Sequence, residues 1–578
     1  MNQEYLSNLN EQQLDAVLCP DDIVFVSAGP GSGKTLTLTS KLTYEIESST
    51  TIPHIVALSY TNTAARELGE RLHRKLEESG TPNEYTLFSG TIHSFCYRML
   101  KTYYNGFSQI ILDDEELWEL AEEIHDSYKQ DIPTGKIMDC LKSNPKVTTT
   151  PIYETICQVK DALQVMSIQD ILSYFLDALD DEGFQQWIRG QVSVVAVDEA
   201  QDLSESNYLI LDKLIGVIPG LKLFLVGDPR QNIFEFNGGS YRNLYEFLER
   251  HPNHTVKTLT ITYRCTQAIT DYVNTFQFSD CENDSLLPVS HSPGTLAVEP
   301  SMSECGEAEM VIKEVLRIGD LTKCAVICNN LKYLSVLIDH LKKKEIPYKV
   351  FGGKKLLKKH IRFLNHILRV IDSDNAYSIR KVAQYANIDI VQDGRKKKNK
   401  FYESELGRQI LAIRESSTFV QIANKTIAML LQPDDGRQIQ NDYSAFLAMS
   451  KQYATASDYL AAFATDWELF AQFYEADYEE CPFPTDKGYL TLSTIHSAKG
   501  LEWENVFIMG LCEGNFPNDY FCQAKTPEEE TEFFNGEWKK MYVASTRAKE
   551  SLHLTYSSSI KRKGFSFAKE PSRFIASL

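Results

Sequence analysis

Residues 28–35 read Ala28-Gly29-Pro30-Gly31-Ser32-Gly33-Lys34-Thr35, and they closely follow an apolar, β-branched run at residues 23–26. The run predicts a buried strand, and the glycines after it allow the backbone to curl around a phosphate with its N–H groups pointing inward. A helix that begins near Lys34 would add the positive end of its dipole. This order of elements predicts a phosphate-binding loop in an α/β domain, with Ala28 in place of the usual first glycine.

A second phosphate-site signature follows at Asp198-Glu199-Ala200-Gln201-Asp202, directly after the apolar run Val194-Val195-Ala196-Val197. The two carboxylates should therefore lie at the carboxyl end of a strand, beside the phosphate loop. Lys34 can reach the β- and γ-phosphates, while Thr35 and Asp198 can hold Mg²⁺. Glu199 can orient and deprotonate the attacking water. The two motifs together predict that the chain binds and hydrolyses a nucleoside triphosphate.

The chain of 578 residues is too long for one hydrophobic core and should form about two to four domains. It has no apolar run of about 18 residues, and Met1-Asn2-Gln3-Glu4-Tyr5 does not resemble a signal peptide. We therefore expect a cytoplasmic protein that makes no membrane contact. The net charge of −20 argues against a protein that coats nucleic acid over its whole surface. A local basic groove remains compatible with it, because salt screens charges beyond about 10 Å.

Apolar runs followed by helix-like segments recur along the chain, which predicts an α/β fold with parallel sheets. Two groups of strands are expected, at residues 23–27, 55–60, 192–197, 221–226 and 258–261, and at 324–328, 348–351, 490–493, 506–509 and 552–555. A segment with helical periodicity interrupts each group. We predict a first domain of residues 1–95 and 190–268 with a helical insertion at 96–189, and a second of 269–375 and 485–578 with a reduced helical insertion at 376–484.

With its phosphate loop and acidic motif, the chain resembles the UvrD/Rep branch of superfamily 1 helicases. Further motifs of that family follow in order, at residues 9–13, 59–65, 90–95, 226–231, 262–266, 494–502 and 542–548. The most recognisable is Thr494-Ile495-His496-Ser497-Ala498-Lys499-Gly500-Leu501-Glu502. The resemblance implies two RecA-like P-loop motor domains, and it does not extend to the helical insertions.

The resemblance also implies roles at the nucleotide site. ATP and Mg²⁺ are the expected cofactors, with Gln13 and Tyr263 at the adenine. Gln231, Arg264 and Arg547 would contact the γ-phosphate. The remaining nucleotide contacts would come from Ala28, Gly29, Pro30, Gly31, Ser32, Gly33, Lys34, Thr35, Gly500 and Glu502. Because Arg264 closes the first domain and Arg547 lies in the second, hydrolysis should depend on closure of the cleft between them.

Single-stranded DNA and duplex junctions are the partners that the resemblance implies. The candidate DNA contacts are Tyr60, Asn62, His93, Phe95, Phe234, Phe236 and His496. Aromatic rings stack on bases with about 1–3 kcal/mol per base, but packing in the core explains each aromatic residue equally well. Phe236 and Asn237 stand where the family has tryptophan and arginine, which predicts a weaker grip on single strands.

These patterns favour an ATP-dependent DNA translocase or helicase, with a 3′→5′ direction implied by the resemblance, in DNA repair or anti-phage defence. The alternative is a DNA-stimulated ATPase that acts as a sensor or regulatory subunit of a nuclease complex and unwinds little. A compact motor of this kind also resembles the helicase subunit of Gabija-type anti-phage systems, which pairs with a nuclease.

Overall fold

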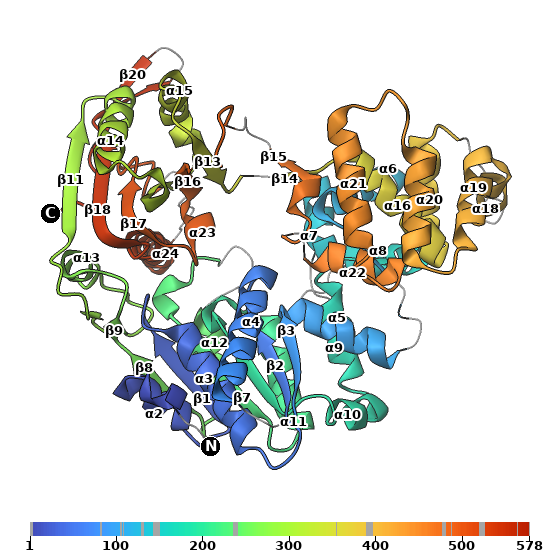
Figure 1. The fold of residues 1–578 in the computed structure, drawn as a ribbon, viewed down its shortest axis with the longest axis horizontal. Helices are drawn as coiled ribbons and strands as arrows, with labels where there is room; N and C mark the ends of the chain where they lie inside the picture. The colour runs from blue at the N-terminus through green and yellow to red at the C-terminus, as the bar shows by residue number, and fades with distance from the viewer. Residues whose placement is uncertain are drawn as a thin grey trace.

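The computed structural model describes residues 4–80, 84–104, 107, 109–128, 132–142, 151–234, 241–353, 355–388, 397–466, 468–476, 481–486, 488–518, 526–562 and 565–576. These residues form two six-stranded parallel sheets and a helical region beside them (Figure 1). In the view of Figure 1 the first sheet lies at the bottom, the second at the upper left and the helical region at the upper right. No helix among the described residues has both the length and the apolar character needed to cross a membrane.

The first sheet has the strand order β3-β2-β6-β7-β1-β8. Its strands are β1 (Ile23–Ala28), β2 (His54–Leu58), β3 (Thr86–Gly90), β6 (Val194–Val197), β7 (Lys222–Gly227) and β8 (Thr255–Leu259). Because all pairs are parallel, the carboxyl ends of β1, β6 and β7 meet at one edge. That edge carries the phosphate loop, the acidic motif and Gln231, which is where ligands bind in open α/β sheets.

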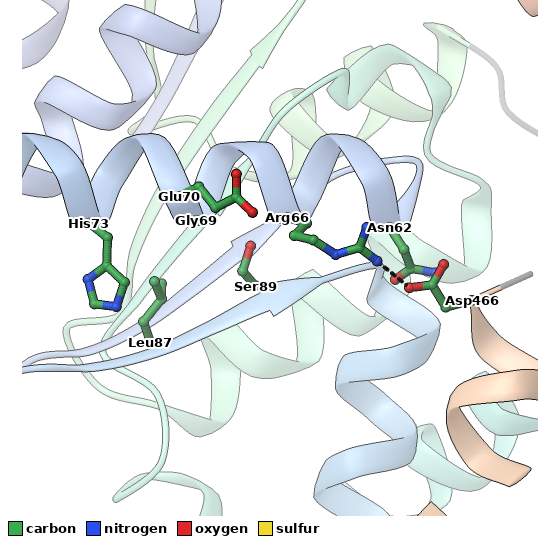
Figure 2. A pocket seen from close by; sticks show the side chains of 8 residues that line it. All are labelled: Asn62, Arg66, Gly69, Glu70, His73, Leu87, Ser89 and Asp466. Carbon is green, nitrogen blue, oxygen red and sulfur yellow. Dashed lines mark hydrogen bonds and ion pairs between the residues drawn. The ribbon is translucent and has the colours of Figure 1, made fainter. Parts of the chain in front are cut away.

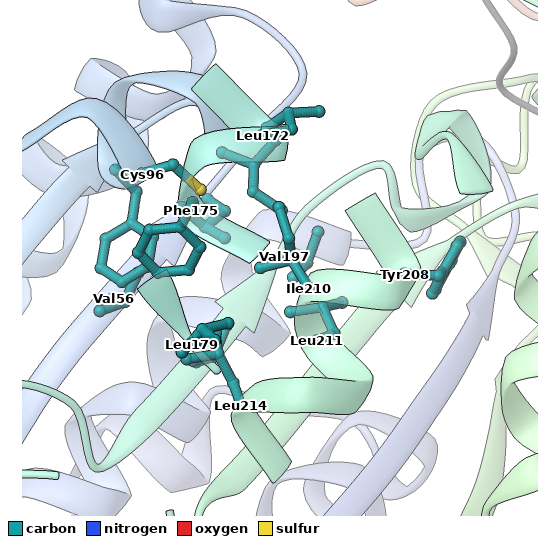
Figure 3. Packing of buried hydrophobic residues seen from close by; sticks show 14 of the residues in the cluster. Val56, Cys96, Leu172, Phe175, Leu179, Val197, Tyr208, Ile210, Leu211 and Leu214 are labelled. Atoms are coloured by element: carbon teal, nitrogen blue, oxygen red, sulfur yellow. The ribbon is translucent and has the colours of Figure 1, made fainter. Parts of the chain in front are cut away.

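Helices cover both faces of the first sheet. One face packs against α2 (Glu11–Leu18), α3 (Lys34–Ser48) and α4 (Asn62–Ser79). The other face packs against α5 (Ile92–Tyr103), α9 (Asp170–Ala178), α10 (Glu182–Ile188), α11 (Glu205–Val217) and α12 (Tyr241–Arg250). The short helix α1 (Glu4–Ser7) lies beside α3 and α4, where Tyr5 bonds to Glu47. Figure 3 shows part of this second core, where side chains of α9 and α11 meet the sheet around Val197. We call this sheet with its helices the first α/β unit.

The second sheet has the order β11-β18-β17-β12-β16-β13. Its strands are β11 (Thr295–Ser301), β12 (Cys324–Cys328), β13 (Tyr348–Phe351), β16 (Leu490–Thr494), β17 (Trp503–Ile508) and β18 (Ala548–Ser557). One face packs against α13 (Gln267–Val273), α23 (Ile495–Ala498) and α24 (Pro527–Ser545), and the other against α14 (Glu304–Ile318) and α15 (Ser335–Lys343). Two small ribbons complete it, β9 (Ile261–Thr262) with β10 (Leu287–Pro288) and β19 (Ser559–Arg562) with β20 (Phe565–Ala568). This is the second α/β unit.

Each of the ten strands expected from the sequence overlaps an observed strand, but two strands of the six-stranded sheets, β3 and β11, were not expected. Both are edge strands, and both are only partly buried along most of their length. An edge strand has one neighbour instead of two, so its sequence carries a weaker apolar signal. β11 also tolerates Pro300, because an edge strand can leave one side of its backbone unpaired.

The helical region combines parts of both predicted insertions. The first contributes α6 (Asp114–Tyr128), α7 (Thr134–Lys142), α8 (Pro151–Leu163) and the short strands β4 (Ile110–Ile111) and β5 (Val165–Met166). The second contributes α16 (Lys359–Ser373), α17 (Ala376–Tyr385), α18 (Lys397–Glu403), α19 (Glu405–Arg414), α20 (Phe419–Leu430), α21 (Arg437–Ser450) and α22 (Ala456–Thr465), tied at its base by β14 (Lys355–Leu357) and β15 (Tyr474–Ala476).

The boundaries of both insertions differ from the expected ones. Helices α5, α9 and α10 lie within the predicted range 96–189, at least in part, yet their apolar side chains complete the core of the first α/β unit. Helix α16 was expected in the second α/β domain, but it packs among the helices of the second insertion. Helical periodicity identifies an apolar face without identifying the partner that covers it, which is why the sequence misplaced these helices.

The two insertions are joined by a buried set of charges. Glu116 of α6 pairs with Arg369 of α16, and both side chains are buried. Arg362 reaches Asp113 at 3.1 Å, and Asn375 donates to the carbonyl of Leu163 at 3.0 Å. The described parts of the two insertions therefore form one contiguous helical body.

Candidate nucleotide site and nucleic-acid interface

The phosphate loop is shaped by two glycines that no other residue can replace without strain. Gly31 and Gly33 have φ angles of +70° and +84°, in the left-handed region. A Cβ at Gly31 would lie 2.4 Å from the Cβ of Arg264, and one at Gly33 would lie 2.5 Å from Nε2 of Gln13. The loop is thus packed closely between α2 and the segment that carries Arg264.

Lys34 begins α3 and folds back over the loop. Its ammonium donates to the carbonyls of Ala28 at 3.1 Å and Gly29 at 3.3 Å. Burial lowers the pKa of Lys34, although the nearby carboxylates of Glu199 and Asp228 oppose this shift. The amino end of α3 and the Lys34 side chain both lie at the loop, where its backbone can receive phosphate oxygens.

Asp198 and Glu199 follow β6 as the sequence predicts. Glu199 has φ = 55°, a conformation that strains a non-glycine residue and is often found at functional sites. Burial and the charge of Glu199 raise the pKa of Asp198. Burial also tends to raise the pKa of Glu199, but Lys499 and Lys34 outweigh it and lower that pKa. Glu199 therefore stays ionised at neutral pH, as a general base requires.

The residues expected to hold Mg²⁺ suit that ion. Asp198 is a half-buried carboxyl beside a second carboxylate, and their repulsion is what a divalent cation would relieve. Thr35 lies in the first turn of α3 and supplies a hydroxyl oxygen. Mg²⁺ prefers such oxygen ligands and is usually held by only one or two protein groups together with substrate phosphates.

Gln231 and Arg547 join the two α/β units at this site. Gln231 lies in the short turn Pro229–Gln231 after β7, and its Nε2 donates to Asp228 at 2.9 Å. Its Oε1 accepts from Nη2 of Arg547 at 3.1 Å. Arg547 precedes β18 and is 2% exposed. Burial and the neighbouring Arg264 lower the pKa of Arg547 to about 9, so it remains charged at neutral pH.

Arg264 lies in the segment that runs from β8 of the first unit to α13 of the second, and it contacts the second unit. Its Nε donates to Glu502 at 2.6 Å, and its Nη1 donates to the carbonyl of Thr546 at 3.2 Å. Glu502 also pairs with Lys549 at 2.6 Å. Gly500, two residues before Glu502, has φ = +85°, and this lets the chain turn between α23 and β17. Arg264, Glu502 and Arg547 are thus brought together at the predicted site.

The predicted adenine contacts lie at the other side of the loop. Gln13 is buried, and its side chain donates to the carbonyl of Ser32 at 2.9 Å and accepts from the N–H of Asn10 at 3.1 Å. It therefore fastens α2 to the phosphate loop. Tyr263 is 54% exposed, and its hydroxyl accepts from Asn10 at 2.9 Å. Its ring offers the flat surface that stacking on adenine would need.

Comparison with known proteins agrees with this geometry. The UvrD/REP helicase N-terminal domain matches residues 9–137 and 118–252, and the UvrD-like helicase C-terminal domain matches residues 437–559. The chain belongs to the UvrD-like helicases. It is therefore an ATP-dependent DNA helicase, a hydrolase, and the expected pair of RecA-like motor domains is confirmed.

Two curated relatives cover nearly all of this helicase. The ATP-dependent DNA helicase PcrA of Staphylococcus epidermidis is 24% identical over 650 residues, which span 99% of this chain and 86% of that protein. The ATP-dependent DNA helicase PcrA of Staphylococcus aureus is 25% identical over 657 residues, with the same coverage.

Three of the predicted DNA contacts of the helicase form one aromatic group. The rings of Tyr60 and Phe234 are stacked with centroids 4.7 Å apart and planes 20° apart. The ring of His496, from the second α/β unit, lies 5.9 Å from Phe234. Burial lowers the pKa of His496 to about 4, so it is neutral at pH 7. This group spans the two units on the side of Gln231.

Phe95 is a correction to the predicted DNA contacts. It is 1% exposed and packs edge-on against Phe88 and Phe175 in the core of the first α/β unit, so it has no face for a base. His93, on the same helix, is half-buried, and burial lowers its pKa to about 4. Phe236 lies outside the described residues.

Asn62 is held by the second insertion instead of being open to a ligand. Its amide donates to the carbonyl of Thr465 at 2.6 Å. The N–H of Thr63 donates to Glu468 at 2.9 Å, and Arg66 pairs with Asp466 at 2.8 Å (Figure 2). These contacts border a pocket of about 310 Å³ lined by Asn62, Arg66, Gly69, Glu70, His73, Leu87, Ser89 and Asp466. Acidic groups therefore lie at the start of α4, where a DNA phosphate is expected.

Two kinds of residue at this interface were missed from the sequence. Lys499 lies within a quoted motif, and its charge among apolar and glycine residues was a signal that could have drawn attention to it. Asp466 and Glu468 carry no such signal, because they follow α22 in an ordinary acidic stretch. Their role depends on where the second insertion is docked.

Proposed function

We propose that this helicase is a single-stranded DNA translocase that couples ATP hydrolysis to 3′→5′ movement. One observation carries the proposal: Arg547 of the second α/β unit reaches Gln231 of the first, beside the phosphate loop. An arginine supplied across a cleft makes hydrolysis depend on the relative position of the two units. Such dependence is what a motor needs to convert hydrolysis into movement.

In the proposed reaction the phosphate loop and Lys34 bind the triphosphate. Thr35 and Asp198 would hold Mg²⁺, which supplies positive charge beside the phosphates when it is bound. Glu199 orients the attacking water and takes its proton. The lowered pKa of Glu199 supports this role, since the group must be ionised before it can accept a proton.

Arg264 and Arg547 complete the site by stabilising charge on the transferring phosphoryl group. Such arginines are worth on the order of 10³–10⁵ in rate. Gln231 lies between Asp228 and Arg547, so its side chain can respond to both the phosphate and the second unit. Its contacts support a role as the sensor of the γ-phosphate.

Single-stranded DNA would cross the two units along Tyr60, Phe234 and His496. Stacking and backbone charge together suit a strand of any sequence, as translocation requires. Asn62 can contact DNA on this path only after Thr465 and Glu468 have moved away from the start of α4. Duplex junctions are the expected substrate ahead of the motor.

A second candidate is a DNA-stimulated ATPase that regulates a nuclease partner in anti-phage defence and unwinds little. The contacts of Thr465, Asp466 and Glu468 favour it, because they reduce the surface that the described conformation offers to DNA. We infer that either role belongs to the cytoplasm, since the DNA and ATP that both roles require are found there.

Paired assays separate these functions. ATP hydrolysis should be slow without nucleic acid and rise with single-stranded DNA, and binding should weaken steeply with salt. Strand displacement should then be compared on duplexes with a 3′ or a 5′ tail. Displacement restricted to 3′ tails supports the 3′→5′ translocase. Stimulated hydrolysis without displacement supports the regulatory ATPase, and no stimulation by any DNA contradicts both.

A further inference from the structure

Lys499 crosses from the second α/β unit to the first. It follows α23, and its ammonium donates to the carboxylate of Asp202 at 2.5 Å and to the carbonyl of Gln231 at 2.8 Å. The ammonium lies 3.9 Å from Oε2 of Glu199. It also lies 5.1 Å from the centroid of the Phe234 ring, in a cation–π contact. All four of these partners belong to the first unit.

This cluster is shielded from water, so each contact has a large effect. The side chain of Lys499 is 7% exposed and that of Asp202 is 1% exposed. Breaking a buried ion pair by removing one partner leaves an uncompensated charge, which is strongly unfavourable. Lys499 therefore holds the turn of Ala200–Asp202 and the backbone at Gln231 in one arrangement.

The same lysine contacts the aromatic group of the proposed DNA path. Phe234 is three residues after Gln231, and its ring is stacked directly on Tyr60. Rings 4.7 Å apart are already in contact, so a base that stacks on Tyr60 from that side must displace Phe234. Displacement of Phe234 changes its contact with Lys499 and pulls on the short segment that ends at Gln231.

We propose that Lys499 is a positioning residue that transmits the presence of an unpaired base at Tyr60 and Phe234 to Glu199 and Gln231. This inference rests on the proposed function, because it assumes that DNA reaches the Tyr60–Phe234 group. Lys499 touches no reacting atom in this scheme. It acts by fixing the backbone at Gln231 and the position of the acidic motif.

A purely structural role makes a different prediction. If Lys499 only fastened the two units together, its loss would reduce hydrolysis by the same factor with and without DNA. A transmitting role instead reduces the stimulation by DNA, because the base is still bound but no longer changes the nucleotide site. The ratio of stimulated to unstimulated rates therefore separates the two.

The test compares Lys499→Met, Lys499→Arg and the control Lys323→Met in the full chain. Lys323 also pairs with a carboxylate, Glu504 at 3.0 Å, but the two side chains are 46% and 42% exposed and both belong to the second α/β unit, so this ion pair does not cross between the units. Hydrolysis is measured with and without saturating oligothymidine, and oligothymidine affinity is measured by fluorescence anisotropy. For Lys499→Met we expect stimulation to fall at least tenfold while affinity changes by less than threefold. Lys499→Arg should recover part of the stimulation, and Lys323→Met should match the wild type.

A double-mutant cycle with Phe234→Leu protects the test against a misfolded variant. Phe234→Leu should also lose stimulation at saturating oligothymidine, and the double variant should lose no more than the larger of the two single losses. The proposal is overturned if Lys499→Met keeps its stimulation, or if both rates fall by one factor. It is also overturned if the two losses multiply. A wild type without any stimulation contradicts the proposed function itself, which is a distinguishable result.

Discussion

Gln231 and Arg547 are separated by 316 positions in the chain, yet Nη2 of Arg547 donates to Oε1 of Gln231 at 3.1 Å. Both side chains are buried, and each is also bonded within its own α/β unit, Gln231 to Asp228 and Arg547 to the carbonyl of Val543. The pair therefore reports the relative position of the two units at the point where the γ-phosphate is expected.

Arg547→Ala should slow ATP hydrolysis by on the order of 10³-fold or more, while ATP affinity changes much less, because the charge is needed mainly as the transition state forms. Steady-state hydrolysis and calorimetric ATP binding measure the two effects. Arg573→Ala is a matched control, since Arg573 pairs with Glu513 on the surface of the same unit. Equal losses in rate and affinity would show that Arg547 is a ground-state contact.

Lys34→Ala should abolish ATP hydrolysis without unfolding the chain. Lys34 supplies the charge at the phosphate loop, and its own bonds in the structure go to two loop carbonyls instead of to the core. Hydrolysis and circular dichroism measure these outcomes. Near wild-type turnover would show that this loop does not bind the nucleotide.

Glu199→Gln should retain ATP binding and lose hydrolysis by on the order of 10²-fold or more, the usual effect of losing a general base. Glutamine keeps the shape of the side chain but cannot accept the proton. ATP binding is measured by calorimetry beside the steady-state rate. If ATP binding is lost while each bound ATP is still hydrolysed at the normal rate, Glu199 has a structural role.

Asp466→Asn together with Glu468→Gln should tighten single-stranded DNA binding about threefold to thirtyfold. Each carboxylate contributes about 0.3–1 kcal/mol to the contacts at α4, and these contacts compete with DNA phosphates. Anisotropy with labelled oligothymidine measures the change. Asp458→Asn is the control, because Asp458 joins the second insertion to Lys101 at 2.9 Å, away from the start of α4. Equal tightening by the control would mean that any loosening of the insertion suffices.

His366 should make the joined insertions sensitive to acid. His366 is 1% exposed, and burial lowers its pKa to about 3. The negative charge of Glu116 opposes this shift. The positive charges of Arg369, Arg362 and Lys381 add to it. An unfolded histidine takes up a proton below about pH 6.5 and the folded one does not, so stability falls as pH drops below 6.5. The loss amounts to about 2 kcal/mol by pH 5.

The pH effect is measured as the difference in melting temperature between wild type and His366→Gln at pH 7.5 and pH 5. Asp113 has a raised pKa of about 6, so its protonation favours the folded state as the pH falls. Asp113 is present in both proteins, and comparing them therefore cancels this opposing contribution. Between pH 7.5 and pH 5, the melting temperature of the wild type should fall further than that of the variant. Parallel losses would show that His366 is protonated in the folded chain.

Local patterns in the sequence were sufficient to predict the central strands, the phosphate loop, the acidic motif and the arginines. A buried strand needs a continuous apolar run, and a phosphate loop needs glycines at fixed spacing before a helix. Gly31, Gly33 and the run at residues 23–26 meet these needs within one short segment, so no distant residue has to be known. Membership in the helicase family follows from motifs of the same local kind.

Tertiary structure alone decided which residues face one another. Phe95 is in the core because α9 covers it, and α16 belongs to the second insertion because α17, α19 and α22 surround it. Lys499 meets Asp202 across 297 positions, and Glu468 meets Thr63 across 405. An apolar face or a single charge specifies that it needs a partner without specifying which one. The choice of partner depends on how whole units pack, and that information is spread over the entire chain.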